Sequence, residues 1–225
     1  MEEPNEFSKS LKKTLTDSDF QDLNVSVADT IMDAAINDGL IKEIPIIGII
    51  VGISRTTLNI KERLFVKKLV YFLTEIKDIP KERRNKMISE INNSEQYGVK
   101  VGEKLLYIID KCDDHVKAKL IAKIFATYLN EKISYIDFIK ASTVIDRAMI
   151  SDLMWFIEGD WHELSIEESG DVINYGLFEI TPISLSIKRS EHMDFDYNFK
   201  IEGAVIKTQI TDIGRKIREI LKEKP

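Results

Sequence analysis

Apolar residues recur at helical spacing along the first two thirds of the chain. Between residues 55 and 77, Leu58, Phe65 and Leu69 are among the apolar positions, while most lysine and glutamate residues fall on the other face. This amphipathic pattern predicts one long helix. The same spacing predicts further helices over about 24–38, 80–91, 95–112 and 114–130. Residues 1–23 are polar and are predicted to form a loose arm or a frayed helix.

The pattern changes after residue 132. Ser134 and Asp137 form a near capping box that opens a predicted helix over 135–158, whose apolar residues cover most of its circumference. The segments that follow are rich in β-branched and aromatic residues and are separated by glycines. This pattern predicts strands over 176–187 and 195–207 joined by a polar turn. Thr211 is predicted to cap a short basic helix that follows.

These elements predict a mainly α protein with a helical N-terminal body and a small C-terminal α+β part. The predicted organisation is a polar arm over 1–23, a helical body over 24–132 and a C-terminal part over 133–225. The order of elements in the last part is compatible with a winged-helix module, in which residues 163–173 take the place of the recognition helix. Their acidic side chains disfavour binding of duplex DNA there, because a phosphate backbone requires Lys and Arg.

Composition and charge exclude several classes of protein. The chain has 225 residues, of which 44% are hydrophobic and 31% charged, which is typical of a folded globular protein. Its net charge of -6 means that any contact with nucleic acid must be local. Cys112 is the single cysteine, which excludes an internal disulfide framework and fits a reducing cytosol. The acidic first residues predict neither a signal peptide nor a transit peptide.

We expect no enzymatic activity, no cofactor and no bound metal ion. The chain has three histidines and contains no Gly-rich phosphate loop, no Gly-x-Ser-x-Gly elbow and no His-Glu-x-x-His pair. His192, Asp194 and Asp196 could together hold a cation, but a solvated turn explains these residues as well.

Three further features are assigned structural roles. Asp114 is interpreted as the cap of the helix that follows it. Asp146 and Arg147, inside an otherwise apolar helix, are interpreted as a buried pair or as network residues that fix the local geometry. Trp155 and Trp161 are expected to be buried at the junction between the helical and wing parts, rather than exposed as a platform for stacking bases.

The most informative segment is the apolar run over residues 44–53, which contains no polar side chain. Our candidate residues for membrane insertion and for contact between subunits are Ile44, Ile46, Ile47, Gly48, Ile49, Ile50, Gly52 and Ile53. As a helix the run would cover about 15 Å, half of a hydrocarbon core, so it cannot cross a bilayer alone. Gly48 and Gly52 have the spacing that lets two helices approach closely. The alternative is a buried core helix or strand of a soluble domain.

Two groups of basic residues bear on function. Arginines and lysines between residues 55 and 68 could meet anionic head groups if the apolar run, packed inside an idle oligomer, were released into a bilayer. The second group is the candidate receptor for an anionic signal such as a nucleotide or a single-stranded oligonucleotide. It consists of Lys188, Arg189, Lys207, Arg215, Lys216 and Arg218. A solvated helix face with ordinary charges is the alternative interpretation.

Several blocks of the chain resemble bacterial proteins found around anti-phage defence loci. The blocks are residues 40–53, Lys61 to Phe65, Ile79-Pro80, Ile133 to Tyr135, Ile145 to Arg147, Ser151 to Leu153, Tyr175 to Leu177 and Thr211 to Gly214. The layout over residues 25–221 is similar to that of abortive-infection alpha-type proteins and of membrane effectors such as that of the Hailong system. The chain departs from a plain membrane effector because it lacks a full-length spanning helix.

This resemblance implies an anti-phage, abortive-infection effector. It would be a cytoplasmic homo-oligomer, held inactive by a partner such as a nucleotidyltransferase or by a nucleotide ligand, that permeabilises the inner membrane on activation. Two alternatives remain open from the residues alone. The first is a soluble winged-helix-like regulator that binds nucleic acid. The second is a non-enzymatic scaffold or antitoxin-like protein in which the apolar run is a subunit interface.

Overall fold

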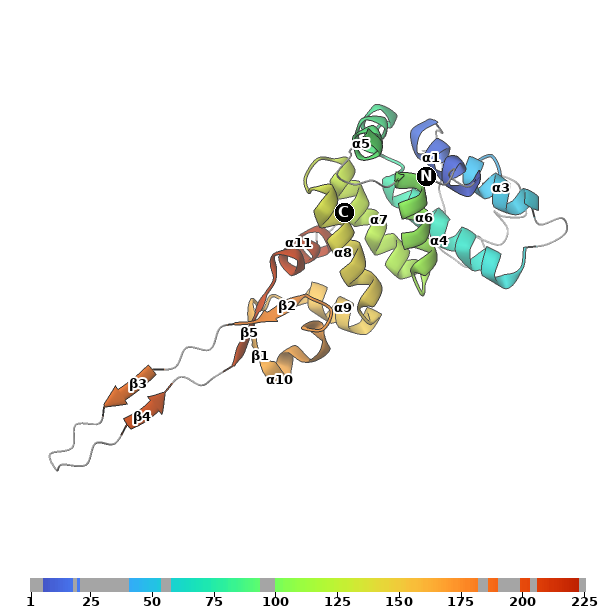
Figure 1. Ribbon diagram of the computed structural model, residues 1–225. Coiled ribbons are helices and arrows are strands. Elements are labelled where there is room, and N and C mark those ends of the chain that lie inside the picture. The colour runs from blue at the N-terminus through green and yellow to red at the C-terminus, as the bar shows by residue number, and fades with distance from the viewer. Residues whose placement is uncertain are drawn as a thin grey trace, which may run out of the picture. The chain divides into compact units, whose positions relative to one another are not determined.

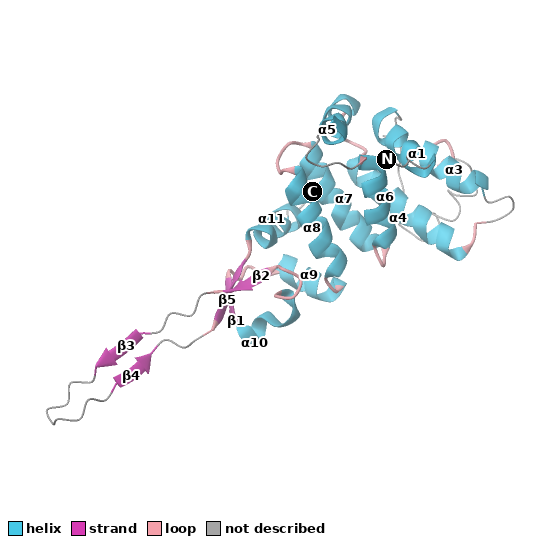
Figure 2. Ribbon diagram, viewed as in Figure 1, coloured by secondary structure: helices cyan, strands magenta, loops and turns pink. Residues whose placement is uncertain are grey.

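The computed structural model describes residues 6–17, 20, 41–53, 58–93, 100–181, 186–189, 199–202 and 206–222. They form a mainly helical protein with a small three-stranded antiparallel sheet, which confirms the coarse fold prediction (Figures 1 and 2). The chain divides into two compact units, Met1–Asp146 and Arg147–Pro225. The helix predicted over 24–38 lies outside the described residues.

The boundary between the units lies later than the predicted one near residue 132. Nearly all of α8 (Tyr135–Arg147) belongs to the first unit, because its aromatic residues pack on α7 (His115–Leu129). The ring centroids of Phe138 and Phe125 are 5.1 Å apart, and those of Tyr135 and Tyr128 are 5.8 Å apart. Aromatic pairs at such distances contribute beyond the area that they bury, so α8 is held to the core of the first unit.

The core of the first unit is built on α4 (Ile60–Ile76) and α7, which pack against each other (Figure 1). Val66, Leu69 and Phe72 of α4 are fully buried, and the ring centroid of Phe72 lies 5.7 Å from that of Phe125. The helices α5 (Lys81–Asn93) and α6 (Val101–Lys111) pack beside this pair. The helices predicted over 55–77, 80–91, 95–112 and 114–130 are thereby confirmed, with shifted ends.

Short side-chain caps set where these helices begin. The long helix predicted from residue 55 begins only at Ile60, because Asn59 and Glu62 form a reciprocal capping box with distances of 3.0 and 2.8 Å. Asp114 caps α7 as predicted, with its carboxylate accepting the amide of Lys117 at 2.9 Å. Ser134 accepts the amide of Asp137 at 3.1 Å, which confirms the predicted start of α8.

Of the two alternatives predicted for residues 1–23, a loose arm or a frayed helix, the described residues 6–17 form a helix, and this helix is packed rather than loose. Residues Glu6–Asp17 form α1, which packs against α3 (Pro45–Ile53), α5 and α6. Its buried face consists of Ser8, Ser10, Leu11, Thr14 and Leu15. Three of these five residues carry small hydroxyl side chains, which hydropathy scores as polar although they are almost completely buried. The helix therefore has an inward face that its sequence pattern does not display.

A glycine allows α1 to approach α6 closely. A Cβ atom built on Gly102 of α6 would lie 2.5 Å from the carbonyl oxygen of Ser8 in α1. That separation is shorter than any normal contact, so a larger residue at this position would force the two helices apart.

The second unit contains a small sheet together with the helices α9, α10 and α11. It comprises α9 (Ile150–Glu158), β1 (Glu163–Ser165), α10 (Ile166–Ser169), a 3-10 turn (Gly170–Val172), β2 (Phe178–Ile180), β5 (Lys207–Ile210) and α11 (Asp212–Lys222). The strands are antiparallel in the order β1-β5-β2. Leu153, Phe156 and Ile217 are fully buried and form its core. Thr211 caps α11 as predicted, accepting the amide of Gly214 at 3.0 Å.

Three details of the second unit differ from the predictions. The single helix predicted over 135–158 is divided, because Met149 adopts an extended conformation between α8 and α9. The strand β1 was not predicted, and its three residues are too few for a recognisable alternation. Each of the two predicted strands is divided. The further pieces, β3 (Ser186–Arg189) and β4 (Phe199–Glu202), pair antiparallel with each other, with Ile187 opposite Ile201.

Candidate functional site

The apolar run over residues 44–53 forms most of one short helix, α3, and the turn before it. Proline is favoured in the first turn of a helix, which fits the start of α3 at Pro45. Ile46 and Ile47 are fully buried, Ile44 and Ile50 nearly so, Gly48 and Ile49 are half-buried, and Gly52 is exposed. The side chain of Ile53 lies outside the described residues. Among the described residues, no helix combines the length and the apolar character needed to cross a membrane.

A buried hydroxyl of α1 holds the beginning of α3. The amide of Ile46 donates to Oγ1 of Thr14 at 3.1 Å, and Thr14 is completely buried. The first amides of a helix have no partner within the helix, so this contact satisfies a group that would otherwise be unpaired. The position of α3 therefore depends on α1.

The two glycines of α3 have different surroundings. A Cβ atom on Gly48 would lie 2.6 Å from the carbonyl oxygen of Lys42, in the turn that precedes the helix. A Cβ atom on Gly52 would meet no described atom within 4 Å. The turn before α3 therefore requires a glycine at position 48. The contact between helices that was predicted for both glycines concerns an assembly of several chains and stays a prediction.

Two cavities adjoin α3, so its cover is incomplete. One, of about 510 Å³, lies between α1 and α3 and is lined by Glu6, Lys9, Ser10, Lys13, Pro45, Gly48 and Ile49. The other, of about 540 Å³, is lined by Phe7, Ile50, Lys61, Glu62, Phe65, Glu103, Leu106, Tyr107 and Asp110. Both cavities lie within the first unit.

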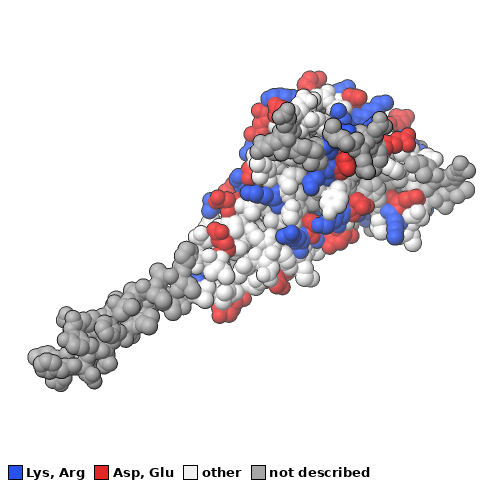
Figure 3. All heavy atoms as spheres, viewed as in Figure 1, with Lys and Arg blue, Asp and Glu red and all other residues white. Residues whose placement is uncertain are grey.

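The basic residues predicted to bind an anionic signal do not form one described cluster. Lys207 pairs with Glu163 at 3.4 Å, and Arg215 of α11 lies 3.4 Å from Asp212. Lys216 is half-buried on α11. Lys188 and Arg189 belong to β3, and their side chains lie outside the described residues. On the first unit, Figure 3 shows basic and acidic side chains interspersed over the visible face.

Arg218 is turned into the second unit, which corrects its predicted role. It is 7% exposed, and its guanidinium donates to the carbonyl oxygen of Phe156 at 3.1 Å and to that of Trp161 at 2.6 Å. Its central carbon also lies 4.3 Å from the ring centroid of Phe156. These contacts bind α11 to the end of α9, so Arg218 is not available to an external anion.

The assignments made for the Asp146-Arg147 pair and for the two tryptophans need correction. Asp146 does not pair with Arg147, which is exposed, but with Lys111 of α6 at 2.7 Å, so the predicted pair is wrong and the alternative of a network residue fits Asp146. The predicted burial of the tryptophans is wrong. Trp155 and Trp161 are 38% and 40% exposed and stack with ring centroids 4.5 Å apart. His192, Asp194 and Asp196 lie outside the described residues. The described residues contain no group of ligands that could hold a metal ion.

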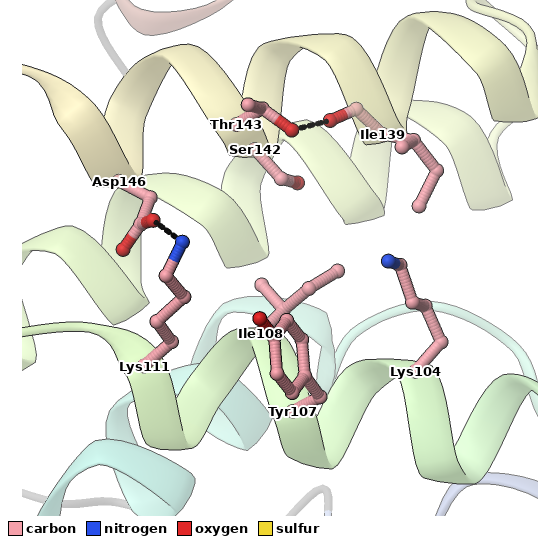
Figure 4. A pocket seen from close by; sticks show the side chains of 8 residues that line it. All are labelled: Lys104, Tyr107, Ile108, Lys111, Ile139, Ser142, Thr143 and Asp146. Carbon is pink, nitrogen blue, oxygen red and sulfur yellow. Dashed lines mark hydrogen bonds and ion pairs between the residues drawn. The ribbon is translucent and has the colours of Figure 1, made fainter.

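Sequence reasoning missed a pocket between α6 and α8, shown in Figure 4. It has a volume of about 60 Å³ and is lined by Lys104, Tyr107, Ile108, Lys111, Ile139, Ser142, Thr143 and Asp146. Ser142 is 3% exposed, and its hydroxyl has no hydrogen-bond partner among the described residues. In the sequence, this pocket could have been indicated only by two lysines seven residues apart, Lys104 and Lys111, and by Ser142 on an otherwise apolar helix face. These segments are distant in the chain, and only the fold brings them together.

Polar contacts hold the region beside this pocket. Lys117 is 3% exposed, and its ammonium donates to Asp113 and to the carbonyl oxygen of Asp146, both at 3.0 Å. Lys68 donates to the carbonyl oxygens of Asp110 and Cys112 at 2.7 and 2.9 Å, which satisfies one carbonyl in the last turn of α6 and that of its C-cap residue. The ends of α6 and α8 that border the pocket are therefore fixed in place.

Cys112 is buried beside these contacts and should make stability sensitive to alkaline pH. Burial raises the pKa of its thiol from the ordinary 9.0 to about 12, while Lys68 acts in the opposite direction. The folded state thus keeps the proton that the unfolded state loses above pH 9.0, so this contribution to stability is complete below pH 9.0 and is lost as the pH rises toward 12.

We expect the free energy of unfolding to fall by up to about 1.4 kcal/mol per pH unit in this range because of Cys112 alone. Urea denaturation of the wild type and of Cys112→Ala should show a steeper alkaline loss in the wild type. Lysine and tyrosine side chains titrate in both proteins, so the difference between the two slopes isolates the thiol. Equal slopes would contradict the prediction.

Comparison of the chain with models of protein families, with curated proteins and with solved structures finds no match.

Proposed function

We infer that this protein is an anti-phage effector of the abortive-infection type, which forms oligomers and disrupts the membrane when a regulatory ligand or partner changes. The observation that carries the proposal is the packing of α3, a nine-residue helix without a polar side chain, beneath the polar helix α1. In this proposal α3 is the insertion element and α1 is its cover. The protein is cytoplasmic while α1 covers α3 and reaches the inner membrane when α1 is displaced.

The energetics of α3 support a reversible arrangement. Hydrocarbon tails are about as apolar as a protein interior, so moving its isoleucines from beneath α1 into a bilayer changes their apolar burial little. The balance is then decided by what holds α1 and α3 together. That contact includes the hydrogen bond from Ile46 to Thr14, which contributes on the order of 1 kcal/mol. A ligand or partner that displaces α1 could therefore shift the equilibrium.

The length of α3 supports action by several chains together. Nine residues of helix extend about 14 Å, which is less than half of a hydrocarbon core of about 30 Å. A single α3 can enter one leaflet but cannot line a pore across both. The proposal therefore includes a homo-oligomer, regulated by a partner such as a nucleotidyltransferase or by a nucleotide or single-stranded oligonucleotide ligand.

A fluorescent reporter on α3 tests this proposal. Ile49 is half-buried and borders the cavity between α1 and α3, so a cysteine at this position can carry a probe sensitive to polarity. The native thiol of Cys112 remains protonated and buried near neutral pH, so it does not compete for the label. Ser89→Cys, at an exposed position on α5, is the matched control.

We expect anionic vesicles to shift the emission of the probe at Ile49 to the blue and leave that at Ser89 unchanged. The same measurement in a Gly102→Ala background, in which α1 is displaced, should give a larger shift together with leakage of vesicle contents. Induced expression of this variant should also collapse the membrane potential of the cells. A probe at Ile49 that does not respond to vesicles in either background contradicts the proposal.

A specific observation favours one alternative, a winged-helix-like regulator that binds nucleic acid. The order β1-β5-β2, with the β3–β4 hairpin between β2 and β5 in the chain, is the arrangement expected for the strands and wing of such a module. The place of its recognition helix is taken by the four residues of α10 and a 3-10 turn. Glu168 of α10 is engaged in a capping box with Ser165.

Gel-shift experiments with single-stranded and duplex oligonucleotides at two salt concentrations separate this alternative from the membrane proposal. A nucleic-acid regulator should bind in a salt-dependent manner and leave vesicles intact. A scaffold or antitoxin-like protein should oligomerise but affect neither vesicles nor oligonucleotides.

A further inference from the structure

We propose that the pocket between α6 and α8 binds an oxyanion of the size of phosphate, held by the Lys104 ammonium and the Ser142 hydroxyl. This inference goes beyond the proposed membrane function and does not require it. It depends on the charges that line the pocket, on an unsatisfied buried hydroxyl and on the volume of the cavity.

The charges in the pocket favour an anion at one end. Lys111 and Asp146 form an ion pair of 2.7 Å, so their charges largely compensate each other. Lys104 has no ion-pair partner among the described residues, and its ammonium lies 5.5 Å from the ring centroid of Tyr107. Figure 4 shows Lys104 at one end of the pocket and the ion pair at the other. The positive charge that remains is therefore that of Lys104.

Ser142 supplies the second observation. Its hydroxyl is buried without a partner among the described residues, and such a group destabilises the fold when it stays unsatisfied. Its neighbours on the buried side of α8, Phe138, Ala141 and Ile145, are apolar, so an alanine would fit this position equally well. In Figure 4 the hydroxyl points into the space between α6 and α8. An anionic oxygen in that space would accept its hydrogen bond.

The volume limits the ligand to a small group. A buried water needs a cavity of at least about 10–15 Å³, so a pocket of about 60 Å³ holds a few waters or one tetrahedral oxyanion. A nucleobase does not fit. Tyr107, which is 60% exposed, stands at the rim, so the rest of a larger molecule can remain outside. The same chemistry thus suits free phosphate or the terminal phosphate of a nucleotide.

Titration of the full chain with inorganic phosphate tests the proposal. We expect saturable binding that weakens at least about tenfold in Lys104→Met and about fivefold in Ser142→Ala, as expected for one charged and one neutral contact. Lys100→Met, an exposed lysine just before α6, is the matched control and should bind as the wild type does. A dinucleotide with and without a 5′-phosphate distinguishes a nucleotide from the free ion, because only tighter binding of the phosphorylated form indicates a nucleotide.

The stability of Ser142→Ala without ligand provides an independent readout. Because the Ser142 hydroxyl has no partner among the described residues, removing it should leave the free energy of unfolding unchanged or raise it. Removing a hydroxyl with a structural role would lower the free energy of unfolding. Absence of saturable phosphate binding overturns the proposal, as does binding that both pocket variants leave unchanged. A protein that binds phosphate but ignores vesicles would retain this site while refuting the membrane function.

Discussion

Replacing Gly102 with alanine should push α1 away from α6 and release the cover of α3. The new Cβ atom would lie 2.5 Å from the carbonyl oxygen of Ser8, a backbone atom that cannot move without the whole helix. Overpacking of this kind typically costs about 1–3 kcal/mol. We expect the free energy of unfolding of the first unit to fall by about 2 kcal/mol.

Local measurements should show where this loss appears. The amide of Ile46 is bonded to Thr14 on α1, so displacement of α1 should speed its hydrogen exchange more than that of amides in the α4–α7 core. Under the membrane proposal, leakage of anionic vesicles should rise several-fold in the same variant. Thr14→Val, which keeps the shape but removes the acceptor, should give a smaller change in the same direction, on the order of 1 kcal/mol.

Gly52→Ala is the matched control and should act in the opposite direction. No described atom lies within 4 Å of a Cβ atom at this position, and alanine favours a helix over glycine by up to about 1 kcal/mol. The variant should therefore be slightly more stable than the wild type, and exchange of its Ile46 amide should not be faster. Unchanged exchange of the Ile46 amide in Gly102→Ala, or equal effects of the two glycine substitutions, would show that α1 does not hold α3 in place.

The helices with one apolar and one charged face could be predicted from the sequence, whereas the packing of α1 could not. The helices α4 to α7 bury leucine, isoleucine and phenylalanine, and hydropathy registers these residues directly. The inward face of α1 is built largely from serine and threonine, whose burial is possible because Gly102 lets the helices approach and because Thr14 finds a backbone partner. These conditions depend on other segments of the chain, so no local pattern contains them.

The candidate sites, too, could be predicted only in part. The sequence indicated that residues 44–53 form a distinct apolar element. The partial burial of this element is consistent with both interpretations given from the sequence, an insertion element and a buried core element. Basic residues on α11 appeared equivalent by charge, but a carbonyl oxygen of α9 and one in the segment after it accept hydrogen bonds that turn Arg218 inward. The pocket of Lys104 and Ser142 joins two segments that are distant in the chain, so it appears only when α6 and α8 are placed together.

The inward orientation of Arg218 assigns it a structural role at the end of α9. The last carbonyls of a helix lack partners within the helix and carry partial negative charge, so a cation there is favourable. The planar guanidinium of Arg218 donates hydrogen bonds to the carbonyl oxygens of Phe156 and Trp161 at the same time, which no other side chain can do in this geometry. Lys222 adds contacts to the carbonyl oxygens of Glu158 and Gly159 at 3.2 and 3.3 Å. The packing of α11 on α9 therefore depends strongly on this one guanidinium.

Arg218→Met should lower the free energy of unfolding of the second unit by about 2–4 kcal/mol, since it removes two hydrogen bonds from a charged donor and a contact with the Phe156 ring. The loss is smaller than the sum of these contacts, because the cost of burying the charge disappears as well. The two tryptophans of the chain, Trp155 and Trp161, both lie in this unit, so their fluorescence during denaturation reports its unfolding.

Arg215→Met, at an exposed ion pair on the same helix, is the matched control. Its free energy of unfolding should stay within about 0.5 kcal/mol of that of the wild type. If the two arginine variants were equally stable, Arg218 would have no structural role, and its assignment to the anion-binding group would have to be restored.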